Sequence, residues 1–142
     1  INKIAIMNTG SFAICIHILT LLTHDQEHWL SSSKIAASIN INPVLVRKEL
    51  LKLKEAGMIQ VKEGKCGGSK LALSPDHIFL SDVFKITNGE HLFSFAKNEP
   101  NQECPVGKSI NTWLENLYSD IDDSVVQLLD NKSLTKFIQQ FV

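Results

Sequence analysis

The sequence predicts a mainly α-helical protein with one small β-hairpin, and three patterns predict it. Two short helical patterns surround a polar turn at residues 40–42, a basic hairpin pattern follows at residues 58–73, and a long apolar stripe begins after Pro105. Two helices around a tight turn, followed by a basic hairpin, form a winged helix-turn-helix domain. The stripe predicts a long C-terminal helix behind that domain.

The first element is expected to be a buried helix from about Asn8 to His24. Residues 12–22 are the longest apolar run, about half of the roughly 20 residues that a membrane span requires. They also lack the basic leader and cleavage site of a signal peptide. We therefore expect no membrane association. The chain begins with Ile1, and Met7 is a candidate natural start, which would make residues 1–6 extraneous.

The next two helices carry recognisable start and stop signals. A Ser cluster at residues 31–33 precedes an apolar-periodic run at residues 35–39. Pro43 begins the following helix, because its fixed φ suits the first helical position, and Gly57 ends it. The apolar residues expected to form the buried face of this helix are Val46, Leu50, Leu53 and Ala56.

The hairpin is expected to have strands at residues 58–61 and 71–73 around a Gly- and Lys-rich tip. After it, Ser81 is expected to cap a short helix over residues 82–87. Residues 90–103 lose periodicity and contain Asn and Pro, so a loop is expected there. The predicted organisation is a DNA-binding domain at 1–89, this loop at 90–103 and a helical dimerisation region at 104–142.

The long C-terminal helix has a near-heptad stripe with acidic residues on its other faces. A stripe of this kind must be covered, and the small N-terminal domain already has its own core, so we expect a second copy of the chain to cover it. The predicted homodimer contacts are Ile110, Leu114, Leu117, Ile121, Val125 and Leu128.

Charge distribution favours DNA as the partner. The net charge is −1, but residues 1–75 carry nine Lys or Arg against five Asp or Glu, and residues 76–142 carry five against ten. Residues 31–70 alone carry eight against three. A basic surface on a nearly neutral protein is the electrostatic footprint of a duplex binder, since phosphate contacts supply most sequence-independent affinity.

The helix that begins at Pro43 should enter the major groove, with Asn42 at the entry. Its outward positions are Val44, Arg47, Lys48 and Leu51. Arg47 is the best candidate for a bidentate contact to guanine, whereas Leu51 is expected to pack. The residues expected to contact DNA phosphates lie at the start of the preceding helix and in the hairpin tip. They are Ser32, Ser33, Lys34, Lys65, Gly67, Gly68, Ser69 and Lys70. The glycines could instead only make the turn, which would leave the lysines unexplained.

A family resemblance extends over nearly the whole chain. Its most specific parts are AGMI at residues 56–59, GGSKLA at 67–72 and LSDV at 80–83. In these segments the chain resembles the Rrf-two (Rrf2) family of bacterial transcription regulators, which includes IscR, NsrR and CymR. The resemblance implies a homodimer with a long dimerisation helix, bound to a palindromic operator in the cytoplasm, most often as a repressor.

Several members of that family bind an iron–sulfur cluster through three cysteines in the loop before the dimerisation helix. Here only Cys104 matches that site, so no cofactor is expected. The odd cysteine count and the lack of a CxxC pair argue against a disulfide framework and a zinc finger. Cys15 should be a buried apolar residue, while Cys66 and Cys104 are candidates for a redox-sensing thiol.

Two other classes of function are open at this stage. The string HDQEH at residues 24–28 matches the H-x-x-E-H pattern of inverted zinc proteases, but it lies in what reads as an exposed connector, and no enzyme is expected. A winged-helix module could also work by protein contact or small-molecule sensing without DNA binding. Retention on nonspecific duplex with steep release by salt would discriminate the two.

Overall fold

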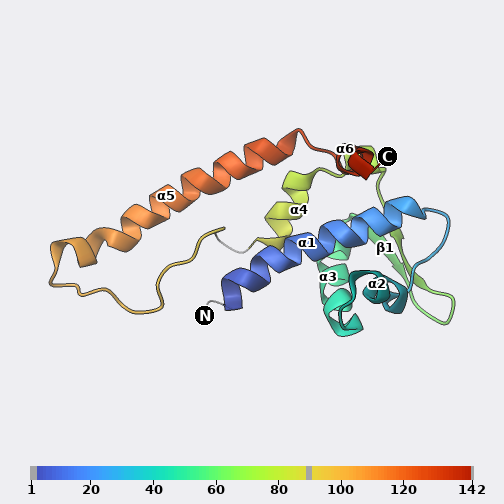
Figure 1. Cartoon of the computed structure of the whole chain (residues 1–142), viewed down its shortest axis with the longest axis horizontal. Coiled ribbons are helices and arrows are strands. Elements are labelled where there is room, and N and C mark those ends of the chain that lie inside the picture. Colours follow the sequence, from blue (N-terminus) through green and yellow to red (C-terminus); the bar gives the residue numbers. More distant parts are fainter. Residues whose placement is uncertain (1–2, 89–90, 142) are drawn as a thin grey trace.

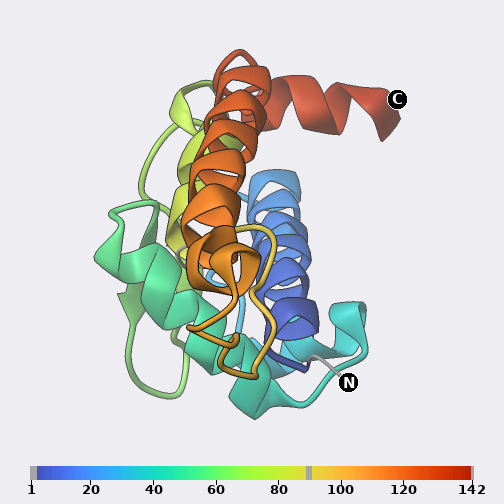
Figure 2. The same cartoon turned by 90° about the vertical axis from the view of Figure 1, so that its left-hand side faces the viewer.

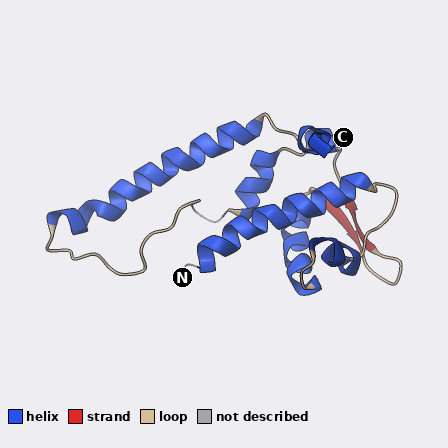
Figure 3. Ribbon diagram, in the orientation of Figure 1, coloured by secondary structure: helices blue, strands red, loops and turns tan. Residues whose placement is uncertain are grey.

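The computed structural model describes residues 3–88 and 91–141 and has the predicted fold class (Figures 1 and 3). The described elements are α1 (Lys3–His24), α2 (Ser32–Ile39), α3 (Pro43–Glu55), β1 (Ile59–Lys62), β2 (Gly68–Leu71), the 3-10 turn η1 (Pro75–His77), α4 (Leu80–Thr87), α5 (Pro105–Asp130), α6 (Leu134–Ile138) and the 3-10 turn η2 (Gln139–Phe141). No described helix is long and apolar enough to cross a membrane.

Helix α1 is the centre of the N-terminal half, and it crosses over α2, α3 and the hairpin (Figure 1). Its apolar residues meet the inner faces of α2, α3 and α4 in one core. The fully buried side chains include Cys15, Ile18, Leu19, Leu22, Ile35, Val46, Leu53 and Val83. Burial of this apolar surface fixes α2 and α3 relative to α1.

The turn between α2 and α3 forms as its residues dictate. The Ser31 hydroxyl accepts from the Lys34 N–H at 3.2 Å, and Asn40 ends α2 in the left-handed region at φ 65°. The Asn42 side chain accepts from the Val44 N–H at 2.9 Å, with Pro43 in the first helical turn. These local bonds confirm the predicted helix-turn-helix. Ala56, which was expected on the buried face, is exposed.

The hairpin differs from the prediction in its second strand, which begins at Gly68 rather than at residue 71 and pairs with Lys62 at that point. Leu30 lies beside this strand, because its N–H and C=O bond the Ser69 backbone at 3.1 and 2.8 Å. A Cβ at Gly68 would lie 2.4 Å from the Leu30 oxygen, so only glycine allows this approach. The chain segment before α2 thus anchors the hairpin.

Helix α4 begins earlier than predicted, at Leu80, and Ser81 is buried inside it instead of capping it. The N-cap is Phe79, whose side chain makes no cap bond. The start is set by distant backbone, because the Leu80 N–H donates to the Lys132 oxygen at 2.9 Å. Tertiary pairing has therefore replaced the local cap.

Helix α6 returns to the N-terminal half after the long α5 (Figure 1). Leu134 is fully buried in the common core, and its N–H donates to the Ile78 oxygen at 2.7 Å. Residues 134–138 thus help to build the core of the half that carries the helix-turn-helix. The assignment of all of residues 104–142 to dimerisation stays a prediction.

His91, in the loop before α5, connects this loop to α5 through hydrogen bonds. The Nδ1 atom of its ring lies 2.8 Å from Asp122 Oδ2 and the Nε2 atom lies 2.9 Å from Glu115 Oε1, and each carboxylate accepts when that nitrogen is protonated. The His91 side chain is 11% exposed. The Leu92 N–H donates to Asp122 Oδ1 at 3.0 Å, and the Tyr118 hydroxyl donates to the Ser94 oxygen at 2.9 Å. The hydrogen bonds to Asp122 and then Glu115 raise the pKa of His91.

This contact predicts a pH-dependent stability. The His91 contribution is fully present below about pH 6.5, the ordinary pKa of an unfolded histidine, and is lost as pH rises through the raised folded pKa. His91→Gln should therefore lower the melting temperature more at pH 6 than at pH 9, in scans of both proteins at constant ionic strength. His77→Gln changes an exposed histidine of η1 that makes no side-chain hydrogen bond among the described residues, and it is the control for the loss of an imidazole. An equal loss for His91→Gln at pH 6 and 9 would contradict this assignment.

Candidate nucleic-acid interface

A cleft of about 360 Å³ lies between the start of α2, the outer face of α3 and the hairpin. Its walls bring together residues that are up to 38 positions apart in the sequence. They are Ser31, Ser32, Arg47, Leu50, Leu51, Lys54, Val61, Lys62, Glu63, Gly64, Gly67, Gly68 and Ser69. The helix-turn-helix and the hairpin therefore present one continuous surface.

The cleft is edged by cations. Arg47, Lys54 and Lys62 are exposed, and no ion pair within the described ranges engages them. Lys54 and Lys62 were not among the predicted contacts. Lys54 follows Arg47 by seven residues, a spacing that repeats the same helical face, so the sequence did hold a signal for it. Three cations without carboxylate partners beside a helix start are suited to phosphate groups.

Trp29 orders two lysines of the hairpin. The Nζ atoms of Lys62 and Lys70 lie 5.8 and 5.2 Å from the centre of its ring. A cation within about 6 Å of an indole face is attracted by the ring quadrupole. The predicted phosphate contact Lys70 is thus held on one side of the hairpin together with Lys62.

The outer face of α3 is open along its length. Val44 is 60% and Leu51 55% exposed, and Arg47 and Lys48 are exposed between them. The expectation that Leu51 packs is wrong, because the hairpin leaves a cleft beside it instead of covering it. Asn42 is engaged as the cap of α3, so its side-chain oxygen is already bonded to the Val44 N–H.

The other predicted contacts have different surroundings. Ser33 and Lys34 are exposed on the first turn of α2, and Lys65 is exposed at the hairpin tip. Ser69 is 2% exposed, so its side chain does not reach the surface. A Cβ at Gly67 would lie 2.0 Å from the Lys62 oxygen. Close contacts with Lys62 for Gly67 and with Leu30 for Gly68 therefore already require both glycines, whatever they contact outside the protein.

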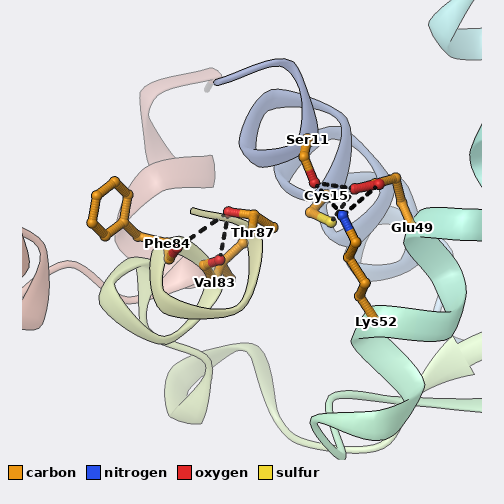
Figure 4. A network of polar contacts seen from close by, with 7 residues as sticks. All are labelled: Ser11, Cys15, Glu49, Lys52, Val83, Phe84 and Thr87. Carbon is orange, nitrogen blue, oxygen red and sulfur yellow. Dashed lines mark hydrogen bonds and ion pairs between the residues drawn. The ribbon is translucent and has the colours of Figure 1, made fainter. Parts of the chain in front are cut away.

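A buried polar cluster fixes α3 against α1 (Figure 4). Glu49 of α3 is 4% exposed, and it accepts hydrogen bonds from the Ser11 hydroxyl and the Cys15 thiol of α1. Lys52 donates from Nζ to Glu49 Oε1 and to the Ser11 oxygen, each at 3.0 Å. Sequence reasoning missed this cluster, since Glu49 reads as a surface residue of an amphipathic helix.

The three cysteines have different surroundings. Cys15 is fully buried, and burial, followed by the adjacent Glu49 carboxylate, raises the pKa of its thiol. Cys66 and Cys104 are exposed, and Cys104 Sγ accepts from the Gly107 N–H at 3.5 Å as the N-cap of α5.

Thiol titration of the native protein with an aromatic disulfide reagent should therefore give two fast equivalents, with the third appearing only in denaturant. The Cys66→Ser/Cys104→Ser variant should give no fast equivalent, and Cys15→Ser should give the same two as the unmodified chain. A fast third equivalent in native buffer would contradict the described burial of Cys15.

The HDQEH string does not form a metal site in the described structure. His24 ends α1, and the exposed His28 pairs with Asp25 at 2.9 Å. No three His, Cys, Asp or Glu side chains of the described residues are grouped closely enough to hold a metal ion. The string is thus the polar connector between α1 and α2.

Comparison with known proteins identifies the family of this chain. The chain matches the model of the Rrf2 family, described as "Iron-dependent Transcriptional regulator", over residues 8–140. It is 36% identical to YwnA of Bacillus subtilis (strain 168), which is named as an HTH-type transcriptional regulator, over 90% of this chain and 94% of YwnA.

Solved structures share the fold. One, described as a DNA-binding protein, is 31% identical with a TM-score of 0.70 and is matched over 98% of its length by 90% of this chain. Another, described as a transcriptional regulator from Lactobacillus plantarum, has a TM-score of 0.79 at 20% identity, with coverage of 92% of this chain and 89% of that one.

The iron in the family's description does not fit the thiols of this chain. Cys15 is buried in α1, Cys66 lies in the hairpin and Cys104 begins α5, so the loop before α5 supplies one thiol where a conventional cluster takes about four. The match over residues 8–140 and the 36% identity to YwnA do not depend on that site. The protein belongs to the Rrf2 family and is a winged-helix, DNA-binding transcription regulator.

Proposed function

We propose that the protein works in the bacterial cytoplasm as a homodimeric repressor that binds a palindromic operator, with α3 of each subunit in a major groove and the hairpin beside it. The observation that supports this most is the open face of α3, where Arg47 and Lys48 are exposed without an ion-pair partner among the described residues. Ser33, Lys34, Lys54, Lys62, Lys65 and Lys70 would contact phosphates around it.

The unpaired surface of α5 supports the homodimer. None of its 26 residues is buried, although it carries the apolar stripe. Four of the predicted contacts, Ile110, Leu114, Ile121 and Val125, are half-buried, whereas Leu117 and Leu128 are 52% and 66% exposed. Val106 and Trp113, which were not predicted, are also more than half exposed. A second copy would cover this face and thereby hold two α3 helices about 34 Å apart.

The experiment that tests DNA binding is a salt titration on labelled duplex. Affinity for nonspecific duplex should fall steeply with salt, and one selected palindrome should bind far more tightly, with one dimer per site. A promoter carrying that palindrome across its start site should be silenced by the protein in a purified transcription assay. A salt-independent affinity, or no preference for any duplex, would overturn the proposal.

Substitutions of Arg47 and Lys70 should affect DNA binding in different ways. Arg47→Ala removes a candidate base contact, so it should cost about 1–3 kcal/mol on the operator and relax the preference at one position. Lys70→Ala removes a phosphate contact, so it should weaken all duplexes alike and reduce the salt slope by about one. Fluorescence anisotropy on operator and scrambled duplex at several salt concentrations measures both. Glu55→Ala is the control at the far end of α3; if all three variants behaved alike, the docking would be wrong.

A further inference from the structure

The first turn of α3 presents a rigid apolar group beside its cations. Val44, the second residue of the helix, is 60% exposed, and its N–H is held by the Asn42 side chain at 2.9 Å. A β-branched residue in a helix has one strongly preferred χ1 rotamer. The two methyl groups of Val44 are therefore held in a fixed direction on the surface, and their position costs little further entropy on binding.

Val44 lies on the same helical face as Arg47 and Lys48, which follow it by three and four residues. The acidic residues of α3 lie elsewhere, since Glu49 is buried against α1 and Glu55 is the last residue of the helix. The one exposed carboxylate in the cleft wall is Glu63, which lies in the hairpin and not on α3. An apolar group next to unpaired cations, on a helix face without a carboxylate of its own, is matched to a polyanion that itself exposes an apolar group.

The major groove of DNA has such a group. Among the base edges exposed there, the methyl group at pyrimidine C5 is the apolar one, and thymine carries it. We propose that Val44 is a specificity-determining residue that contacts a pyrimidine 5-methyl group next to the base read by Arg47. This proposal rests on the proposed function, because it requires α3 to lie in the major groove.

The helix geometry limits where that methyl group lies. Three residues of α-helix span about 4.5 Å along the axis, whereas successive base pairs are about 3.4 Å apart. The methyl group should therefore lie within about two base pairs of the guanine bound by Arg47. In a palindromic operator it should occur once in each half-site.

The experiment begins with selection of duplexes from a random library by the full-length protein. Each thymine of the selected site is then replaced by deoxyuridine, which removes only the methyl group. At one position per half-site the substitution should weaken binding by about fourfold, the size expected for one buried methyl group, and by about 16-fold when both half-sites are changed. Positions outside the two-base-pair window should change little.

A double-variant cycle assigns the effect to Val44. Val44→Ala should bind the thymine site more weakly by a similar factor and should no longer distinguish thymine from deoxyuridine there, while Val44→Ile should keep the distinction. Leu45→Ala is the matched control, because Leu45 is 48% exposed on the adjacent helical position, and it should also keep the distinction. A C·G pair at the same position should bind more weakly than a 5-methyl-C·G pair, because only the second carries the methyl group, and equal binding of the two would contradict the proposal.

The outcomes separate the inference from the proposed function. If selection enriches no sequence and binding is independent of salt, the proposed function fails and the inference fails with it. If a palindrome is enriched but deoxyuridine is tolerated at every position, or if Val44→Ala keeps the thymine preference, only the inference is overturned. Loss of the preference in Val44→Ala but not in Leu45→Ala supports it.

Discussion

Leu117→Asp should make the protein monomeric and weaken its binding to a palindromic operator by about 100-fold or more. Leu117 is 52% exposed in the middle of the α5 stripe, so a charge there costs the isolated chain little. In the proposed dimer the same carboxylate would be buried without a partner, which is strongly unfavourable. The two half-sites of the operator would then be bound by two independent monomers, without the gain in affinity of roughly 10²–10⁴ that comes from joining the two DNA-binding domains in one dimer.

Light scattering coupled to size exclusion measures the first effect, with twice the 15.9 kDa chain mass expected for the unmodified protein and the single mass for the variant. Anisotropy on full and half operators measures the second. Ser119→Asp is the control, because Ser119 is exposed two residues further on, about 200° around the helix from Leu117. A Leu117→Asp protein that remains dimeric at micromolar concentration would refute the proposed interface.

Lys52→Met should destabilise the fold by about 3 kcal/mol. The Glu49 carboxylate would remain buried against α1 with its cationic partner removed, and breaking one side of a buried pair typically costs about 3–5 kcal/mol. The lower end applies, because the Lys52 side chain is 32% exposed and water can partly replace it. Urea unfolding monitored by circular dichroism at pH 7 measures the change in the free energy of unfolding.

Two further variants separate charge burial from simple loss of a lysine. Lys54→Met removes a neighbouring exposed lysine of the same helix and should change stability by less than about 0.5 kcal/mol. Adding Glu49→Gln to Lys52→Met removes the unpaired charge while keeping the shape, so it should recover most of the loss. If the double variant were as unstable as Lys52→Met alone, the Glu49 charge would not be the cause.

Short-range signals predicted the elements that lie between residues 31 and 62. Ser31, Asn42 and Pro43 act within one helical turn of their own positions, and both helices begin where they were predicted, although the cap role of Asn42 was not predicted. The cationic face of α3 followed from the same periodicity, although Lys54 of that helix and Lys62 of β1 were missed. Two predictions failed where backbone hydrogen bonds to distant residues set the structure. Ser81 does not cap α4, because Leu80 is bonded to Lys132, and β2 starts at Gly68, because Leu30 pairs with Ser69.

The helix-turn-helix, the hairpin and the long apolar helix could be predicted from the residues alone, because caps, glycines and apolar spacing act on neighbours a few residues away. Which polar residues are buried depends on contacts between segments that are distant in the sequence. Glu49 meets Ser11 across 38 residues, and Asp122 meets His91 across 31. An acidic residue on an amphipathic helix is predicted to be exposed to solvent, because its neighbours along the chain follow the same pattern whether it is exposed or is buried against a distant hydrogen-bond donor.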